Sequence, residues 1–185
     1  MLIEKLILVD RHDNQVGEGE KLQVHLDGSL HRAFSVFIFN SNGQLLLQQR
    51  AVEKYHSAGL WANTCCGHPR PGEDKLAAAR RRLHEEMGFD CSLIPVGSFI
   101  YHAQVSDNMV EYEYDHLYAG VFDGSPQHNP AEVAQYKWLD LADIRQQIAT
   151  NPNSFSQWFL RIFQQPAPLQ PELWWQQVRL KEAQS

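Results

Sequence analysis

The chain has 185 residues, 43% of them hydrophobic and 11% aromatic, which is enough apolar material for the core of one globular domain. Its 16 lysines and arginines against 22 aspartates and glutamates give a formal net charge of −6, which argues against nucleic acid or an anionic membrane as the main partner. Three cysteines, two of them adjacent, make no disulfide framework and are typical of a reducing compartment, so we expect a cytoplasmic protein.

The first half of the chain predicts strands around a loop. The N-terminal apolar residues are interrupted by Glu4 and Lys5, and no later segment is apolar for the length of a membrane span, so we expect neither a signal peptide nor a transmembrane helix. Residues 6–9 predict a short strand that ends in a turn over 10–14. Residues 33–39 and 45–47 flank an Asn-Ser-Asn-Gly sequence, which is typical of a β-hairpin. Residues 62–73 hold two glycines and two prolines, which exclude a helix and predict a loop at the Cys-Cys-Gly-His sequence.

The second half predicts helices and further strands. Asp74 can cap a helix that Gly88 ends, with apolar residues at helical spacing between them. A hairpin follows, with strands over 98–105 and 110–121 and a turn over 106–108. A strand around 136–139 leads through Asp140, a second candidate cap, into a helix to about Ile148, and another helix is expected over 155–163.

The order of these elements predicts an α/β fold, with a mixed β-sheet sandwiched between α-helices in a single compact domain. We expect this domain to span residues 1–165. A Pro-rich connection over 166–171 leads to a short amphipathic tail over 172–182, which packs on the body or stays partly mobile, so that residues 166–185 form an appendage.

Residues 67–89 resemble the Nudix motif, in which a Gly and a Glu precede a carboxylate-rich helix. The matching residues are Gly67, Glu73, Arg81, Leu83, Glu85, Glu86, Gly88 and Phe89. One position differs, because Arg82 stands where the motif has the first glutamate of its helix. In Nudix hydrolases these carboxylates hold divalent cations that activate water, so this reversal of charge should weaken such a site. Arg82 and Glu86 lie four apart on one helical face, and the residues alone allow a plain surface ion pair.

Two further groups of residues suggest chemistry. Glu111 and Glu113 lie two apart in an expected strand and point to one face, where they either crowd around a cation or a proton or form a solvated surface. Imidazoles and carboxylates together suit a divalent first-row metal. Cys66, beside His68, is interpreted as a reactive thiol, a buried inert thiol or a zinc ligand, although no Cys-x-x-Cys spacing supports structural zinc, and Cys65 is taken as its structural neighbour.

The Thr-Cys-Cys-Gly-His-Pro sequence over 64–69, with Tyr101 and the Glu-Tyr-Glu sequence over 111–113, resembles the type I isopentenyl-diphosphate delta-isomerase family. This family is a divergent branch of the Nudix fold, and the similarity runs from about Lys21 to Trp158. The resemblance implies a Nudix-like sheet sandwiched by helices. It also implies an isomerase that interconverts isopentenyl and dimethylallyl diphosphate by protonation and deprotonation, in isoprenoid biosynthesis.

The resemblance also implies roles for individual residues. Catalysis falls on Cys66 and Glu113, with Tyr101 assisting Glu113. The site for a divalent metal, Mn, Mg or Zn, falls on His25, His31, His68, Glu111 and Glu113, and a Mg²⁺ bound with the substrate diphosphate falls on Glu86. Contacts to the diphosphate fall on Lys21, Arg50, Lys54 and Arg82. Trp158 would line the substrate cavity, although the sequence alone equally allows a core residue on a helix face.

Two other functions stay open at this point. A true Nudix diphosphohydrolase predicts released phosphate and a full carboxylate helix, which Arg82 contradicts. A metal-dependent binding module, with a purely structural His/Glu site, predicts no turnover and no need for Cys66. For the isomerase we expect a small-molecule diphosphate as the partner, no nucleic acid, no membrane, and a monomer rather than an oligomer.

Overall fold

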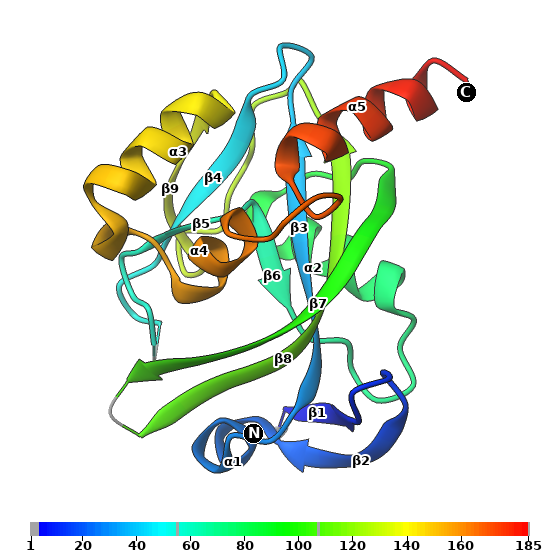
Figure 1. The fold of residues 1–185 in the computed structure, drawn as a ribbon, viewed down its shortest axis with the longest axis vertical. Coiled ribbons are helices and arrows are strands. Elements are labelled where there is room, and N and C mark those ends of the chain that lie inside the picture. The colour runs from blue at the N-terminus through cyan, green and yellow to red at the C-terminus, as the bar shows by residue number, and fades with distance from the viewer. Residues whose placement is uncertain (1–3, 55, 107, 185) are drawn as a thin grey trace.

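The computed structural model describes residues 4–54, 56–106 and 108–184, which form one mixed sheet and the helices around it (Figure 1). Its strands are β1 (Lys5–Val9), β2 (Gln15–Glu20), β3 (His31–Phe39), β4 (Leu45–Arg50), β5 (Trp61–Ala62), β6 (Cys65–Gly67), β7 (Leu93–Ser106), β8 (Met109–Val121) and β9 (Val133–Leu139). Its α-helices are α1 (Lys21–Asp27), α2 (Lys75–Met87), α3 (Leu141–Thr150), α4 (Gln157–Phe163) and α5 (Pro171–Glu182), with a 3-10 turn, η1, at Pro152–Ser154.

The central strand of the sheet is β3. It runs parallel to β8, from His31 opposite Glu113 to Phe39 opposite Val121, and antiparallel to β6. A long antiparallel hairpin adds β7 beyond β8, while β4 pairs with β9. The predicted hairpin of β3 and β4 is present, but the two strands pair only at Phe39 and Leu45, because β4 continues beside β9.

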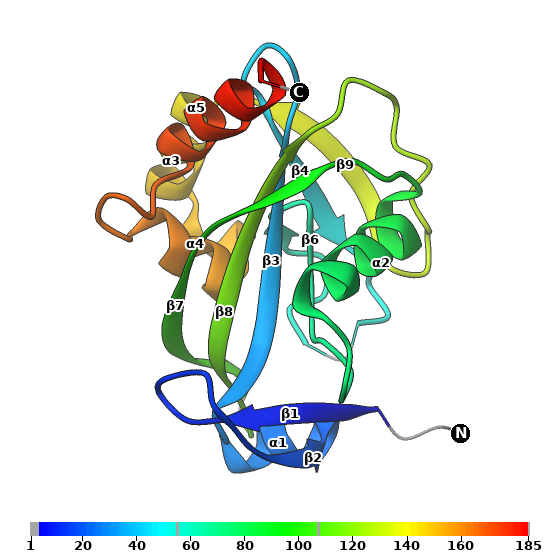
Figure 2. The same cartoon turned by 90° about the vertical axis from the view of Figure 1, so that its right-hand side faces the viewer.

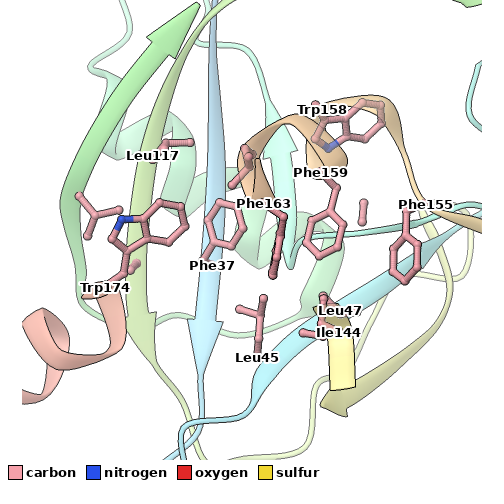
Figure 3. Close-up of a cluster of buried hydrophobic side chains, with 14 of the residues drawn as sticks. Phe37, Leu45, Leu47, Leu117, Ile144, Phe155, Trp158, Phe159, Phe163 and Trp174 are labelled. Atoms are coloured by element: carbon pink, nitrogen blue, oxygen red, sulfur yellow. The ribbon is translucent and has the colours of Figure 1, made fainter. Parts of the chain in front are cut away.

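Helices cover both faces of the sheet, as the sequence predicted. Figure 2 shows α2 on one face and α3, α4 and α5 on the other. On the α2 face, Phe34 and Val36 of β3 pack against Ala79 and Leu83. On the opposite face, Phe37 of β3 and Leu45 and Leu47 of β4 pack against aromatic side chains of α4 and α5 (Figure 3). Alternate residues of β3 therefore contribute to two cores, which is why six of its seven residues from Ala33 to Phe39 are apolar.

The boundaries of α2 follow from its caps. Asp74 accepts a hydrogen bond from the Ala77 amide at 2.9 Å, and Gly88 ends the helix in the left-handed conformation with φ 74°. Gly88 also has no room for a side chain, because a Cβ there would lie 2.2 Å from the carbonyl oxygen of Gln127. Both predicted ends of this helix are confirmed.

Three local features of the structure differ from what the sequence predicted. Residues 15–27, for which no helix or strand was predicted, form β2 and α1, and Gly19 lets the helix approach because a Cβ there would lie 2.5 Å from Val24. The loop predicted at Cys-Cys-Gly-His is wrong, since residues 65–67 form strand β6 against β3; glycine and proline excluded a helix but not a three-residue strand. The last predicted helix begins at Gln157 rather than Phe155, after η1.

Some expectations touch residues outside the described ones. The turn predicted over 106–108 includes Asp107, and the segment considered as a signal peptide includes residues 1–3. Within the described part of the chain, no helix combines the length and apolar character needed to cross a membrane.

The C-terminal helix packs on the body through Trp174, which is completely buried beside Phe37 with ring centroids 4.8 Å apart. We expect Trp174→Ala to lower the free energy of unfolding by about 3–5 kcal/mol, because it leaves a large cavity in the core. The neighbouring Trp175→Ala, at a half-buried position, should cost about 1 kcal/mol. Urea denaturation of both variants measures the difference, and equal losses would contradict the anchoring of α5 through Trp174.

Candidate functional site

A cluster of imidazoles and carboxylates lies at the end of the sheet near α1. Glu111 and Glu113 project from the same face of β8, and His31 lies opposite Glu113 in the parallel register. His25 comes from α1 and His68 follows β6. The potential ligand atoms of these five residues all lie within 4.8 Å of one another.

Short contacts join the imidazoles to the carboxylates. His68 Nε2 lies 3.0 Å from Glu113 Oε1, and His31 Nε2 lies 3.5 Å from the same oxygen. His25 Nε2 lies 3.4 Å from Glu111 Oε2. Two buried carboxylates this close repel each other unless positive charge lies between them.

The backbone orients two of the rings. His25 Nδ1 lies 2.6 Å from the Lys21 carbonyl oxygen and His31 Nδ1 lies 2.9 Å from that of Ser29. An Nδ1–H that donates to a carbonyl leaves Nε2 with its lone pair aimed at the carboxylates, which is the usual arrangement of metal-binding histidines. Among the described residues, His31 Nε2 and Glu111 Oε2 are buried without a hydrogen-bond partner. The donor set and these two atoms therefore fit a divalent cation.

The pKa values of two histidines in the cluster are shifted in opposite directions. Burial opposes protonation of His25, but the proximity and charge of Glu111 raise its pKa above the usual value. Burial, with His31 and Lys21 nearby, lowers the pKa of His68 well below its usual value. The surroundings of His25 thus favour a positive charge, whereas those of His68 favour the neutral ring. A divalent metal ion would supply positive charge near Glu111 and would bind a neutral imidazole through its lone pair.

Glu113 also contacts Tyr101 through its other oxygen. The two residues are directly opposite in the hairpin of β7 and β8, and the Tyr101 hydroxyl donates to Glu113 Oε2 at 2.5 Å. Burial and the charge of Glu113 raise the pKa of Tyr101 well above its usual value, so Tyr101 stays a donor. Burial raises the pKa of Glu113, but the proximity and charge of His31 and the hydrogen bond from Tyr101 outweigh it and leave the pKa below its usual value. Glu113 is therefore an ionised carboxylate whose Oε1 faces His31 and His68 and whose Oε2 is bonded to Tyr101.

Cys66 is half-buried on β6, opposite Ser35 of β3. Burial raises the pKa of its thiol to about 12, so Cys66 holds its proton at neutral pH. This environment suits a proton donor rather than a thiolate nucleophile or a thiolate ligand. Among the described residues, the group that fits a metal does not include Cys66. Cys65 points away, into the core beneath α2.

A cleft of about 990 Å³ opens above this cluster. The predicted site residues that line it are Lys21, Arg50, Lys54, Cys66, His68, Arg82, Glu86, Tyr101, Glu111, Glu113 and Trp158. His25 and His31 are completely buried beneath it. The structure thus places eleven of the predicted site residues on one cleft and the other two, His25 and His31, beneath it.

Three of the four cations predicted to bind the diphosphate, Lys21, Lys54 and Arg82, contact carboxylates. Arg82 contacts Glu85 at 2.7 Å, Glu132 at 3.3 Å and Glu86 at shorter range, while Lys54 pairs with Glu132. Glu86 is buried, so the Arg82–Glu86 pair is not the exposed ion pair that the sequence also allowed. Lys21 contacts Glu4 at 3.0 Å.

Trp158 satisfies both interpretations made from the sequence, because it belongs to the hydrophobic core and also lines the cleft. Its indole N–H donates to Asn63 Oδ1 at 3.1 Å, and the Arg50 guanidinium carbon lies 5.1 Å from its ring centroid.

Sequence reasoning missed two polar residues of this region, His56 and Asp115. His56 Nε2 lies 3.1 Å from Glu111 Oε1, and burial lowers the pKa of His56 to about 4. Asp115, completely buried, accepts a hydrogen bond from Ser35 at 2.8 Å. The alternation that placed Glu111 and Glu113 on one face extends to Asp115 and could have found it, whereas no periodicity marks His56.

Comparisons with known proteins agree with this geometry. Residues 29–159 match the family model of the NUDIX domain. The isopentenyl-diphosphate Delta-isomerase of Serratia proteamaculans is 53% identical over 171 residues, which are 92% of this chain and 96% of that protein. Isopentenyl-diphosphate Delta-isomerase 2 of Photorhabdus laumondii is 56% identical over 159 residues, 86% of this chain and 90% of that protein.

Solved structures resemble the chain in fold. DR0079 from Deinococcus radiodurans has a TM-score of 0.67 and 24% identity, with 80% of this chain and 90% of that chain covered. The MutT protein of Methanosarcina mazei Go1 has a TM-score of 0.59 and 15% identity over 83% of this chain and 95% of that chain. With relatives about half identical over most of its length, the chain belongs to the isopentenyl-diphosphate Delta-isomerase family, a family with the NUDIX fold.

Proposed function

We propose that the chain interconverts isopentenyl and dimethylallyl diphosphate, with Cys66 and Glu113 as its two proton-transfer groups. The observation that carries this proposal is that Cys66 and Glu113 line one cleft, in which burial raises the pKa of the thiol and the surroundings of Glu113 lower the pKa of its carboxyl group. Moving a double bond requires one proton to be added to the terminal alkene carbon and another to be removed from C2. Hydrolysis of a diphosphate has no use for this pair.

Tyr101 and the His/Glu cluster keep Glu113 in position. The Tyr101 hydroxyl holds Oε2, the oxygen that faces away from His31 and His68. We assign the divalent metal site to His25, His31, His68, Glu111 and Glu113. A Mn²⁺, Mg²⁺ or Zn²⁺ ion bound there would supply the positive charge that lets the two carboxylates lie together and that tunes the basicity of Glu113.

The cations of the cleft would bind the diphosphate without cleaving it. Lys21, Lys54 and the guanidinium groups of Arg50 and Arg82 surround the cleft and can donate hydrogen bonds to phosphate oxygens. Glu86 would hold a Mg²⁺ that arrives with the diphosphate. Arg82, in place of a hydrolase carboxylate, provides counter-charge and does not help to activate water.

Trp158 completes the cleft on its apolar side. Protonation of the alkene creates positive charge on a tertiary carbon, which the face of an indole ring stabilises. The ring also keeps out water, which would otherwise trap the cation as an alcohol.

We further propose that the protein works as a monomer in the cytoplasm.

Isopentenyl diphosphate incubated with the protein and Mg²⁺ and Mn²⁺ in heavy water should yield dimethylallyl diphosphate with deuterium in a methyl group. Reversal should then place deuterium at C2 of the recovered substrate. Inorganic phosphate and isopentenyl monophosphate should stay at the background of a protein-free control. Mass spectrometry and NMR of the extracted diphosphates provide both measurements.

The other outcomes identify the alternatives. Phosphate release without carbon-bound deuterium would reject the isomerase and support a diphosphohydrolase. If neither phosphate nor carbon-bound deuterium is found although the protein still binds metal, the result would support a binding module.

A further inference from the structure

The loop between β4 and β5 brings a sixth polar side chain, His56, to the His/Glu cluster. Backbone hydrogen bonds close the base of this loop, from Gly59 to the Arg50 carbonyl at 3.0 Å and from Arg50 to the Leu60 carbonyl at 3.0 Å. His56 points inward and its side chain is 6% exposed. It lines the cleft, yet it lies outside the group whose ligand atoms converge.

His56 contacts Glu111 through the carboxylate oxygen Oε1. Its Nε2 lies 3.1 Å from Oε1, whereas the other oxygen, Oε2, faces His25 Nε2 at 3.4 Å. Within the described part of the chain, Oε2 is buried and accepts no hydrogen bond. The two oxygens of this carboxylate therefore face different neighbours, with Oε1 toward His56 and Oε2 toward His25 in the cluster.

The neighbours of His56 define which of its nitrogens carries hydrogen. The Ser57 hydroxyl lies 3.3 Å from Nδ1 and can donate to it. A carboxylate oxygen accepts hydrogen bonds, so Nε2 is the donor in the contact with Glu111. The assignment of hydrogen to Nε2 satisfies both contacts with one neutral tautomer.

We propose that His56 is a positioning residue that holds Glu111 through Oε1, so that Oε2 alone is presented to a divalent metal. The proposal rests on the proposed function in one respect, since it takes Glu111 as a metal ligand. A carboxylate fixed on one side loses less rotational freedom when metal binds, and partners of this kind raise metal affinity. The His56 ring also meets Trp158 edge-on, with centroids 6.1 Å apart and an interplanar angle of 86°.

Two variants separate the hydrogen bond from the bulk of the ring. His56→Phe keeps an aromatic ring against Trp158 but has no donor for Glu111. His56→Gln lacks the ring but places an amide N–H close to the position of Nε2. Titration calorimetry with Mn²⁺ alone, on metal-stripped protein without substrate, should give a dissociation constant about tenfold weaker for His56→Phe. For His56→Gln it should stay within about threefold of the unchanged protein, and kcat of His56→Phe should recover at saturating Mn²⁺.

Several results would overturn this role. Unchanged Mn²⁺ affinity in His56→Phe means that the hydrogen bond does not position Glu111. Equal losses in both variants, with unchanged thermal unfolding of the metal-free proteins, mean that the ring rather than the donor matters. Failure of the unchanged protein to bind Mn²⁺ removes the metal site and the proposal with it. If the protein binds Mn²⁺ but isomerises nothing, only the proposed reaction fails, and the two affinities still decide the role of His56.

Discussion

Cys66→Ala should lower turnover by about 10²–10⁴-fold with the fold intact, because alanine cannot exchange a proton with the substrate. The thiol lines the cleft and keeps its proton at neutral pH, since burial raises its pKa to about 12. The measurements are kcat for the conversion of isopentenyl diphosphate and the thermal unfolding curve of the variant.

The adjacent thiol provides the matched control. Cys65 is completely buried on the other side of β6, in the core with Ala78 and Leu83 of α2. Cys65→Ala should therefore cost about 1 kcal/mol of stability through lost packing and leave kcat nearly unchanged. Equal kinetic damage at both positions would leave no basis for assigning catalysis to Cys66.

Glu113→Gln should lose both metal affinity and turnover, and turnover should stay about 10²–10⁴-fold low even at saturating metal. The reason lies in its two oxygens, since Oε1 faces His31 and His68 while Oε2 accepts from Tyr101. The neutral amide of glutamine lacks the negative charge that a metal needs at the position of Oε1. It also lacks the base that proton transfer needs.

Glu111→Gln separates these two losses. Glu111 lies on the same strand face but contacts His25 and His56, whereas the Tyr101 hydroxyl bonds to Glu113. Its replacement should weaken Mn²⁺ binding in calorimetry, whereas kcat should return toward that of the unchanged protein as Mn²⁺ is raised. Full activity of Glu113→Gln at saturating metal would refute the assignment of Glu113 as a proton-transfer group.

Local signals in the sequence predicted the elements whose formation depends on neighbours along the chain. Asp74 and Gly88 act within one or two turns of α2, so their residue types were enough to place both ends of that helix. The strand β2 and helix α1 depend instead on tertiary contacts. A polar strand with two glycines forms because β1 supplies its hydrogen bonds, and α1 is held where Val24 fits against Gly19.

The residues of the candidate site likewise include some that the sequence predicted and some that it did not. Alternation along β8 placed Glu111 and Glu113 on one face before any fold was known, and family resemblance added the histidines. No pattern could predict His56, because only the path of the loop between β4 and β5 brings it to Glu111. The pairing of Lys54 and Arg82 with Glu132 is equally invisible in the sequence, since Glu132 comes from the segment just before β9.

The parallel pairing of β3 with β8 has a consequence for how the chain folds. It joins segments as far apart as Ser35 and Asp115, which are 80 residues apart in sequence, and it sets His31 opposite Glu113. A slip of one residue along β8 would turn both ligand carboxylates toward α2 and leave the histidines alone. Closing so long a loop is entropically costly, and such contacts form slowly. The capacity to bind a metal should therefore arise late in refolding, as a signal that this strand pair has reached its native register, and added metal should not speed the earlier steps.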